Sequence, residues 1–153
     1  MKTSPAFDFQ LAHRFFSTDC FNRAWELIEK PRRTPGEDEQ MLLLALASLW
    51  HWTEREDCTD RNLSIGYWQT ARVYALLGQS ENAFRYAEMC LQASEEQPPF
   101  YQGYAHEALA RAAMIAGDAT GAANHLSQAR EFAAAVADDQ ERAMLETDLE
   151  TLA

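Results

Sequence analysis

The stretch NLSIGYWQTARVYALLGQSENAFRYAEMCL, residues 62–91, carries the clearest helical pattern in the chain. Its apolar residues recur at spacings of three and four on both sides of Gly78, as they do on one face of an α-helix. Gly78–Ser80 is a turn signal, because glycine readily adopts the left-handed conformation that ends a helix. The stretch predicts two helices folded back on each other, carrying Ile65, Tyr67, Trp68, Ala71, Tyr74 and Ala75 on the first and Ala83, Tyr86, Ala87, Cys90 and Leu91 on the second.

The rest of the chain shows the same pattern of helices between short breaks. Pro31 and the pair Pro98–Pro99 end helical segments, because proline has no amide hydrogen to donate and clashes with the preceding turn. The polar run Ser17–Asp19 predicts another break, and no segment shows the alternation of a strand. The pattern predicts eight helices, over about residues 8–16, 21–28, 34–52, 62–77, 81–91, 101–115, 118–136 and 138–152.

Thr34 and Glu37 form the clearest helix start. The Thr34 hydroxyl is spaced to accept from the Glu37 amide while the Glu37 side chain reaches back, and Pro35 suits the first helical position. The helix that follows is apolar nearly all round, which predicts a central position with neighbours on more than one side. Its apolar residues are Met41, Leu42, Leu43, Leu44, Leu46, Leu49 and Trp50.

A second hairpin matches the first when Gly117 is aligned with Gly78. Self-similarity at a fixed period is typical of helical repeat arrays, in which small residues let paired helices approach closely. The alignment pairs Ala83 with Ala122, Ala87 with Leu126, Cys90 with Ala129, Tyr74 with Ala113, Ala71 with Ala110 and Tyr67 with His106.

The segment Tyr74-x3-Gly78-x4-Ala83, together with Leu91, resembles the tetratricopeptide repeat (TPR). The Gly117 unit keeps the glycine and the alanine but has Ala113 in place of the large aromatic residue. The offset from Gly78 to Gly117 also exceeds the family's period of roughly 34 residues. The run from Asp19 to Trp25 looks like the turn of an earlier copy. The stretch ASLWHW, residues 47–52, is similar to one in small bacterial proteins of uncharacterised activity.

The resemblance implies an all-α fold, in which antiparallel helical hairpins stack as a short TPR-like right-handed solenoid of about eight helices. It implies a single domain over residues 1–153. It also implies a scaffold that binds a protein or peptide partner along a concave face, because stacked hairpins make an extended curved surface. A homodimer is a second option for the partner.

The charge balance and the cysteines restrict the function classes. The chain has 13 lysine and arginine residues against 24 aspartate and glutamate residues, which argues against nucleic acid and anionic membrane as partners. Met1–Pro5 lacks the apolar core of a signal peptide, and the longest apolar run is too short to span a bilayer. Cys20, Cys58 and Cys90 form no disulfide pattern, so a reducing, cytoplasmic location is predicted.

If consecutive helices run antiparallel, many aromatic residues gather at one end of the bundle. The functional interpretation is a pocket for a flat ligand or an anchored side chain, and the alternative is that aromatics fill the gap between splayed helix ends. The predicted ligand- or partner-binding residues are His51, Trp52, Tyr67, Trp68, Arg72, Tyr104 and His106.

No catalytic motif accompanies this pattern. There is no Gly-x-Ser-x-Gly and no phosphate-binding glycine loop, and His106-Glu107 lacks the second histidine of a zinc protease helix. We therefore expect no catalytic residue, no bound metal and no cofactor. A non-catalytic TPR-like interaction module is the preferred interpretation. A small-molecule sensor with an aromatic and histidine-lined pocket is the alternative, and a metal-dependent enzyme using His51 and His106 is a weaker one.

Overall fold

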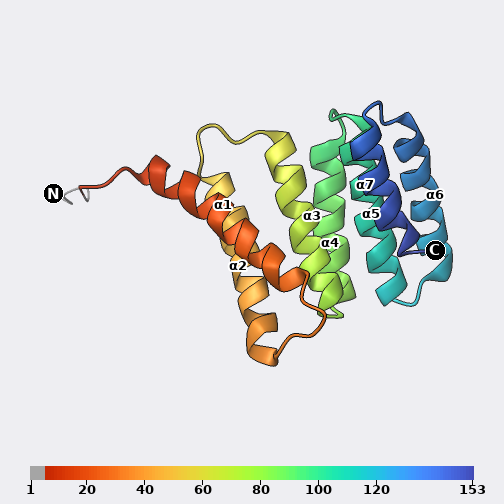
Figure 1. Cartoon of the computed structure of the whole chain (residues 1–153), viewed down its shortest axis with the longest axis horizontal. Coiled ribbons are helices and arrows are strands. Elements are labelled where there is room, and N and C mark those ends of the chain that lie inside the picture. The colour runs from red at the N-terminus through yellow and green to blue at the C-terminus, as the bar shows by residue number, and fades with distance from the viewer. Residues whose placement is uncertain (1–5) are drawn as a thin grey trace.

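A computed structural model describes residues 6–153, and the predicted absence of a signal peptide at Met1–Pro5 concerns residues outside that range. The described residues form helices and connecting turns without strands (Figure 1). The seven helices are α1 (Phe9–Ile28), α2 (Pro35–Thr53), α3 (Asp60–Leu76), α4 (Ser80–Ser94), α5 (Pro99–Ile115), α6 (Ala119–Ala135) and α7 (Asp139–Glu150).

The count of eight is wrong because the predicted break at Ser17–Asp19 does not occur. Ser17 lies fully buried inside α1, where its carbonyl accepts a 2.7 Å hydrogen bond from the Ser48 hydroxyl of α2. The hydroxyls of Ser17 and Thr18 donate to the Arg14 carbonyl one turn earlier, which keeps these polar side chains compatible with a helix. The run Asp19–Trp25 therefore belongs to one continuous helix, and its assignment as the turn of an earlier repeat is also wrong.

The predicted repeat appears in the helix boundaries. The shift that places Gly78 on Gly117 also places both ends of α3 on those of α5, and the start of α4 on the start of α6. Gly78 and Gly117 both have positive φ, 72° and 77°. In each turn the glycine amide and the next amide donate to carbonyls three and five residues earlier, the Schellman pattern that closes a helix.

The predicted helix starts at Thr34, Asp118 and Asp138 are confirmed. The Thr34 hydroxyl accepts from the Glu37 amide at 3.2 Å, and the Glu37 carboxylate accepts from the Thr34 amide at 2.9 Å. Asp118 and Asp138 accept from amides in the first turns of α6 and α7. The reciprocal cap between Thr59 and Asn62 at the start of α3 was not predicted.

Helix α2 is less central than its composition suggests. Among the described residues it contacts only α1 and α3. Met41, Leu44 and Leu49 are buried against these neighbours, whereas Leu43 and Trp50 are 59% and 55% exposed. The all-round apolar pattern therefore reflects two covered sides plus an exposed apolar face, not a surrounded helix.

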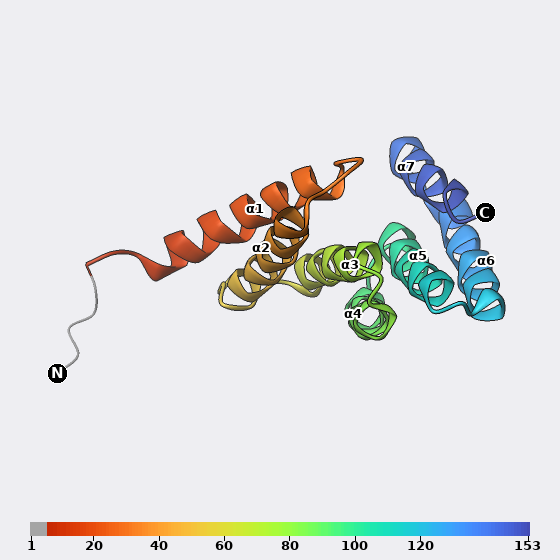
Figure 2. The same ribbon diagram turned by 90° about the horizontal axis from the view of Figure 1, so that it is seen from below.

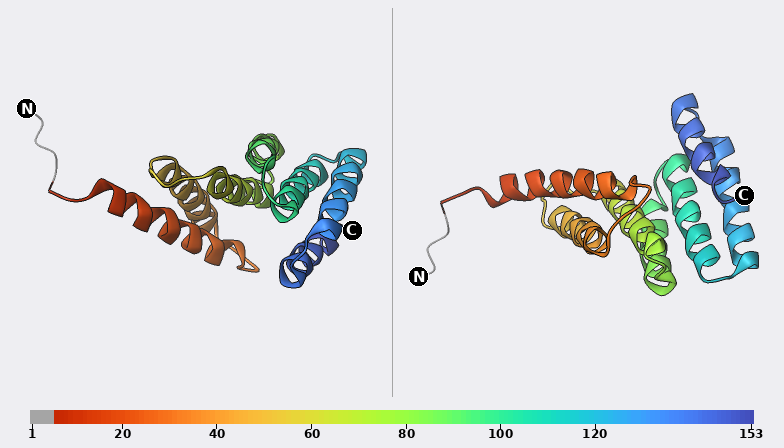
Figure 3. Two further views of the ribbon diagram at one scale, coloured as in Figure 1. Left: turned by 90° about the horizontal axis from the view of Figure 1, so that it is seen from above. Right: turned by 60° about the horizontal axis from the view of Figure 1, so that its bottom comes forward.

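Each helix packs against the next one along the chain. In Figure 2 and in the left view of Figure 3, α1 and α7 stand on one side of α3 and α5, and α4 lies on the other side. Direct contacts join α3 with α5 and α5 with α7, which makes the odd-numbered helices a continuous surface. No described helix combines the length and the hydropathy needed to cross a membrane.

Replacing Gly78 by valine is expected to lower the free energy of unfolding by about 1 kcal/mol or more, because a β-branched residue is strained at positive φ. A Cβ at Gly78 would meet no atom within 4 Å, so the loss comes from the backbone alone. Urea titration measures it. Gly36→Ala, in the first turn of α2 with Thr34 Oγ1 as its only close neighbour at 3.9 Å, is the control and should not destabilise.

Candidate functional site

Residues of the odd-numbered helices line a hollow of about 440 Å³. Figure 2 shows α1 and α7 on the same side of α3 and α5. We call this hollow the groove. The second half of α1 and the middle of α7 form its walls, and the first halves of α3 and α5 form its floor. Its lining residues are Phe21, Trp25, Ser64, Ile65, Trp68, Phe100, Tyr101, Tyr104, Met144 and Asp148.

Aromatic rings that contact one another build the groove. Trp68 is the centre of this arrangement, with its ring centroid 5.5 Å from that of Trp25 on α1 and 5.3 Å, edge to face, from that of Tyr104 on α5. Phe100 packs edge to face on Tyr104 at 5.0 Å. Edge-to-face packing fixes ring orientation, so the groove has a defined shape before anything binds.

A buried carboxylate lies beneath this aromatic surface. Glu107 of α5 is fully buried, and its Oε2 accepts from the Trp68 indole at 2.8 Å. Its Oε1 accepts from Arg72 of α3 at 3.1 Å and also from Arg111, one turn along α5. Three donors therefore satisfy one buried acidic side chain, and the two cations compensate its charge.

The same network fixes helix α7 against α5. Arg111 donates to the Asp148 carbonyl at 3.3 Å and to the Thr151 hydroxyl at 2.6 Å. Tyr104 donates its hydroxyl to the Asp148 carboxylate at 2.6 Å. Burial and then this carboxylate raise the pKa of Tyr104, so the phenol stays protonated and keeps donating. These bonds hold the α7 wall at a set distance from the floor.

Burial also affects Arg72, whose side chain is 19% exposed. Desolvation lowers the pKa of Arg72, and the adjacent Glu107 opposes that effect. No buried side-chain nitrogen or oxygen among residues 6–153 lacks a hydrogen-bond partner. The polar groups of the groove are therefore engaged in holding the helices, and the surface available to a ligand is mainly apolar and aromatic.

Two smaller hollows continue the groove. One, of about 180 Å³, shares Phe21 and Ile65 with it and is bounded by Trp52, whose ring lies 3.8 Å from the Arg55 guanidinium. The other, of about 140 Å³, lies between α3, α5 and α7 and is lined by Arg72 and Arg111 among others. The accessible surface therefore extends along the odd-numbered helices beyond the central 440 Å³.

The seven predicted binding residues lie in different places. Trp68 and Tyr104 line the groove, Trp52 bounds the smaller hollow beside it, and Arg72 lines the hollow of about 140 Å³ further along α3 and α5. Tyr67 lies near Tyr86 of α4, with ring centroids 6.4 Å apart, and does not line the groove. The remaining two, His51 and His106, belong to separate histidine pairs.

Each histidine pair joins the two helices of one hairpin. The Nδ1 atoms of His13 on α1 and His51 on α2 are 2.9 Å apart. Those of His106 on α5 and His125 on α6 are 3.4 Å apart, and the His106 ring stacks on Phe132. His13 and His125 are both half-buried against a partner ring.

The histidine pairs do not form the metal site considered from the sequence. Helices α2 and α5 make no contact, so His51 and His106 belong to separate sites, and Glu107 is engaged by arginines. Each pair offers two imidazole nitrogens. Within the range that the structure describes, no cluster of three or more histidine, cysteine, aspartate or glutamate side chains is placed to hold a metal ion.

Stability is expected to fall as the pH drops below about 6.5, the ordinary pKa of histidine. Burial lowers the pKa of His51 and of His106, and the partner imidazole lowers each further, while Glu54 opposes the effect at His51. A histidine with a lowered folded pKa binds its proton more readily in the unfolded chain. Its contribution is therefore complete above the unfolded pKa and is lost as the pH falls through the folded pKa.

Thermal unfolding followed by circular dichroism between about pH 7.5 and 5.5 measures this slope. His106→Gln should flatten it, because glutamine has no proton to gain in this range. A melting temperature with the same pH dependence in both proteins would contradict the prediction for the α5–α6 pair.

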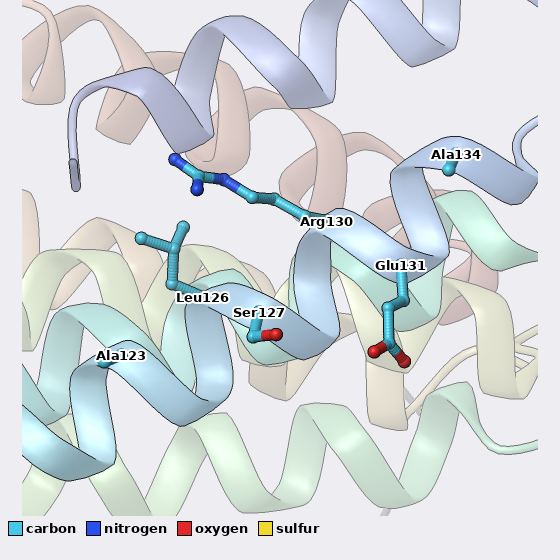
Figure 4. Close-up of a pocket in the computed structure, with 6 residues that line it drawn as sticks. All are labelled: Ala123, Leu126, Ser127, Arg130, Glu131 and Ala134. Carbon is cyan, nitrogen blue, oxygen red and sulfur yellow. The ribbon is translucent and has the colours of Figure 1, made fainter.

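A further hollow, of about 500 Å³, lies on one helix only (Figure 4). Its six lining residues are Ala123, Leu126, Ser127, Arg130, Glu131 and Ala134, all from α6. A depression along a single helix surface has no opposing wall to orient a ligand, so the groove is the better candidate.

Several groove residues were missed from the sequence. Trp25 was assigned only to a helix and to the turn of an earlier repeat, and Phe100, Met144 and Asp148 were not considered. Glu107 had one readable signal, since an acidic residue within an alanine-rich helix, four residues before Arg111, indicates a local ion pair. Its second partner, Arg72, is 35 residues away and no spacing rule reveals it.

Comparison with models of protein families, with curated proteins and with solved structures gave no match for this chain.

Proposed function

We propose that this chain is a non-catalytic, TPR-like interaction module that binds a segment of a partner protein in the groove. The observation that carries the proposal is a preformed aromatic hollow of about 440 Å³ made by four alternate helices. In a right-handed stack of helical hairpins the first helices of the hairpins would line the concave side, and the residues that line the groove come from the odd-numbered helices.

The chemistry of the groove favours a partner segment with apolar anchors flanked by basic residues. Ile65 and Met144, 36% and 57% exposed, present apolar surface at its edges. The one charged residue in its lining is Asp148, and the chain carries a net charge of −11. Aromatic hollows accept one or two apolar side chains, and an acidic surface attracts lysine and arginine around them.

A small-molecule sensor is the second candidate. The groove volume falls within the roughly 300–1,000 Å³ typical of ligand pockets, and aromatic walls suit a flat ligand. The Tyr104 hydroxyl in the floor donates to Asp148, and Arg72, outside the lining, donates to Glu107, which leaves few groups to orient a polar ligand. This satisfied floor favours the peptide over the small molecule.

A random peptide library selected on the purified protein tests the proposal. The expected result is enriched sequences with apolar residues near lysine or arginine. Ile65→Glu should weaken their binding at least about tenfold, because a charge in an apolar contact costs more than about 1.4 kcal/mol. Leu43→Glu adds the same charge at a position on α2 that is 59% exposed and lies outside the groove, and should bind like the unmodified protein.

Peptides that bind both variants equally well would place recognition outside the groove and overturn the proposal. A failure to enrich peptides, together with a small-molecule adduct in native mass spectrometry, would support the sensor instead. If that adduct is lost in Ile65→Glu and retained in Leu43→Glu, the groove is its site.

A further inference from the structure

The first turns of α1 extend beyond the other helices (Figure 1 and Figure 2). Large apolar side chains are exposed there. We call residues 7–16 the arm. Phe7, Leu11 and Phe15 are 58%, 61% and 59% exposed, although each is large and apolar. Leu11 and Phe15 lie one helical turn apart on the side of α1 opposite Cys20 and Ala24, which are buried. Phe7 precedes the helix, and its ring centroid lies 4.8 Å from that of Phe9.

The exposed apolar surface of the arm is large for a single chain. Phe9 and Phe16 lie about 140–160° around α1 from Leu11, and together with Trp50 of α2 they are exposed on another side of the arm, by 49%, 43% and 55%. With about 150–250 Å² for each full aromatic side chain, the exposed apolar area summed over both sides of the arm is about 600 Å². Phe7, Leu11 and Phe15 supply about half of that area, so an interface of roughly 800 Å² per partner needs contacts beyond these three side chains.

The arm is also nearly symmetric about Leu11. Phe7 and Phe15 lie four residues to either side of it, and Asp8 and Arg14 lie three residues to either side. We propose that the arms of two copies of this chain pair antiparallel about a twofold axis at Leu11, forming a homodimer. The axis sets Leu11 against its own copy once, and it sets Phe7 against Phe15 and Asp8 against Arg14 twice each.

Charge favours this contact over others between two copies. The whole chain carries −11, so most surfaces of two copies repel each other. The arm contains one acidic residue, Asp8, and one basic residue, Arg14, and therefore has no net charge with His13 neutral. Asp8 caps α1 by accepting from the Leu11 amide at 3.1 Å through one carboxylate oxygen, and a carboxylate has a second oxygen that can accept from Arg14 of the other copy.

The dimer is independent of the groove. Phe21 and Trp25, which line the groove, lie more than a helical turn beyond the arm. The groove of each copy therefore stays accessible when the arms pair. Loss of peptide binding and loss of the dimer are consequently separate outcomes.

Sedimentation equilibrium or light scattering of the purified full chain tests the dimer. The expected mass at micromolar concentrations is twice that of one chain. Leu11→Glu should raise the dissociation constant at least about tenfold, because two like charges would meet at the centre of the interface. Leu43→Glu, which adds the same charge at a site 59% exposed on α2, should leave it unchanged.

A charge-reversal experiment tests the antiparallel register. Arg14→Glu and Asp8→Lys should each weaken their own dimer, since each brings like charges together. An equal mixture of the two variants should restore a dimer of one copy of each, because every pair is then opposite in charge. Circular dichroism checks that Asp8→Lys, which loses the α1 cap, keeps its helix content.

A monomeric unmodified protein, or equal dissociation of Leu11→Glu and Leu43→Glu, would overturn the proposal. So would a dimer that Ile65→Glu also abolishes, because the arm of one copy would then occupy the groove of another. A mixture that stays monomeric would reject the antiparallel register.

Discussion

Glu107→Ala is expected to lower the free energy of unfolding by about 3–5 kcal/mol, the largest effect of any substitution considered for this chain. The side chains of Arg72 and Arg111 are only 19% and 16% exposed, and Glu107 is fully buried between them. Removing the carboxylate leaves two poorly hydrated cations and an unpaired Trp68 indole. Chemical denaturation followed by circular dichroism measures the loss.

Glu107→Gln separates the effect of the charge from that of the volume, and Glu88→Ala is a control at an exposed glutamate. Glu107→Gln keeps an acceptor oxygen and a side chain of similar size, and should lose less stability than the alanine variant. Glu88→Ala removes an exposed glutamate from α4 and should change stability by less than about 0.5 kcal/mol. Equal effects at positions 107 and 88 would contradict the structure at this network.

Gly103→Val should destabilise the fold by about 1–3 kcal/mol through overpacking where α5 meets α7. A Cβ at Gly103 would lie 2.5 Å from Leu145 Cδ2 and 3.4 Å from Phe132 Cβ, and Leu145 is fully buried. The added side chain must push α7 outward. Because α7 carries Met144 and Asp148, the groove should change shape and peptide binding should weaken as well.

A double-mutant cycle checks the cause. Leu145→Ala vacates the space that the valine needs, so the double variant should be more stable than the sum of the two single losses predicts. Strict additivity would mean that the two positions are not in contact. Gly36→Ala, with only Thr34 Oγ1 at 3.9 Å, is the matched glycine control without a clash.

The parts of the fold that were predicted correctly depend on local chemistry. Gly78 and Gly117 end their helices with positive φ because residues with a Cβ are strained there, and this preference is visible in a single residue type. The reciprocal cap of Thr34 and Glu37 requires only a spacing of three. These signals act within one turn of helix, so a sequence contains them completely.

The incorrect prediction at Ser17–Asp19 shows the limit of the same reasoning. Serine, threonine and aspartate together favour a break because their side chains compete for backbone groups. In this chain the Ser17 hydroxyl instead accepts from Arg55, 38 residues away, and its carbonyl accepts from Ser48. Partners on other elements reverse a local preference, and their positions depend on how the helices pack.

Only part of the candidate site was predicted, because which residues face the groove also depends on how the helices pack. Trp68 and Tyr104 face the groove as residues of the repeat, whereas Tyr67, one residue earlier on α3, packs near α4. Adjacent positions on a helix point about 100° apart, and the side on which the groove forms depends on where α1 and α7 lie.

The amino-acid sequence alone determines that this chain is helical, where most of its helices start or end, and that the hairpin at Gly78 is repeated at Gly117. These properties arise from the hydrogen bonds and dihedral preferences of neighbouring residues. Tertiary packing decides that Glu107 lies beneath Trp68 between two arginines, that the histidines form two pairs, and that Leu11 faces solvent. Each of these depends on distances between residues far apart in the chain, which are established only when the helices pack.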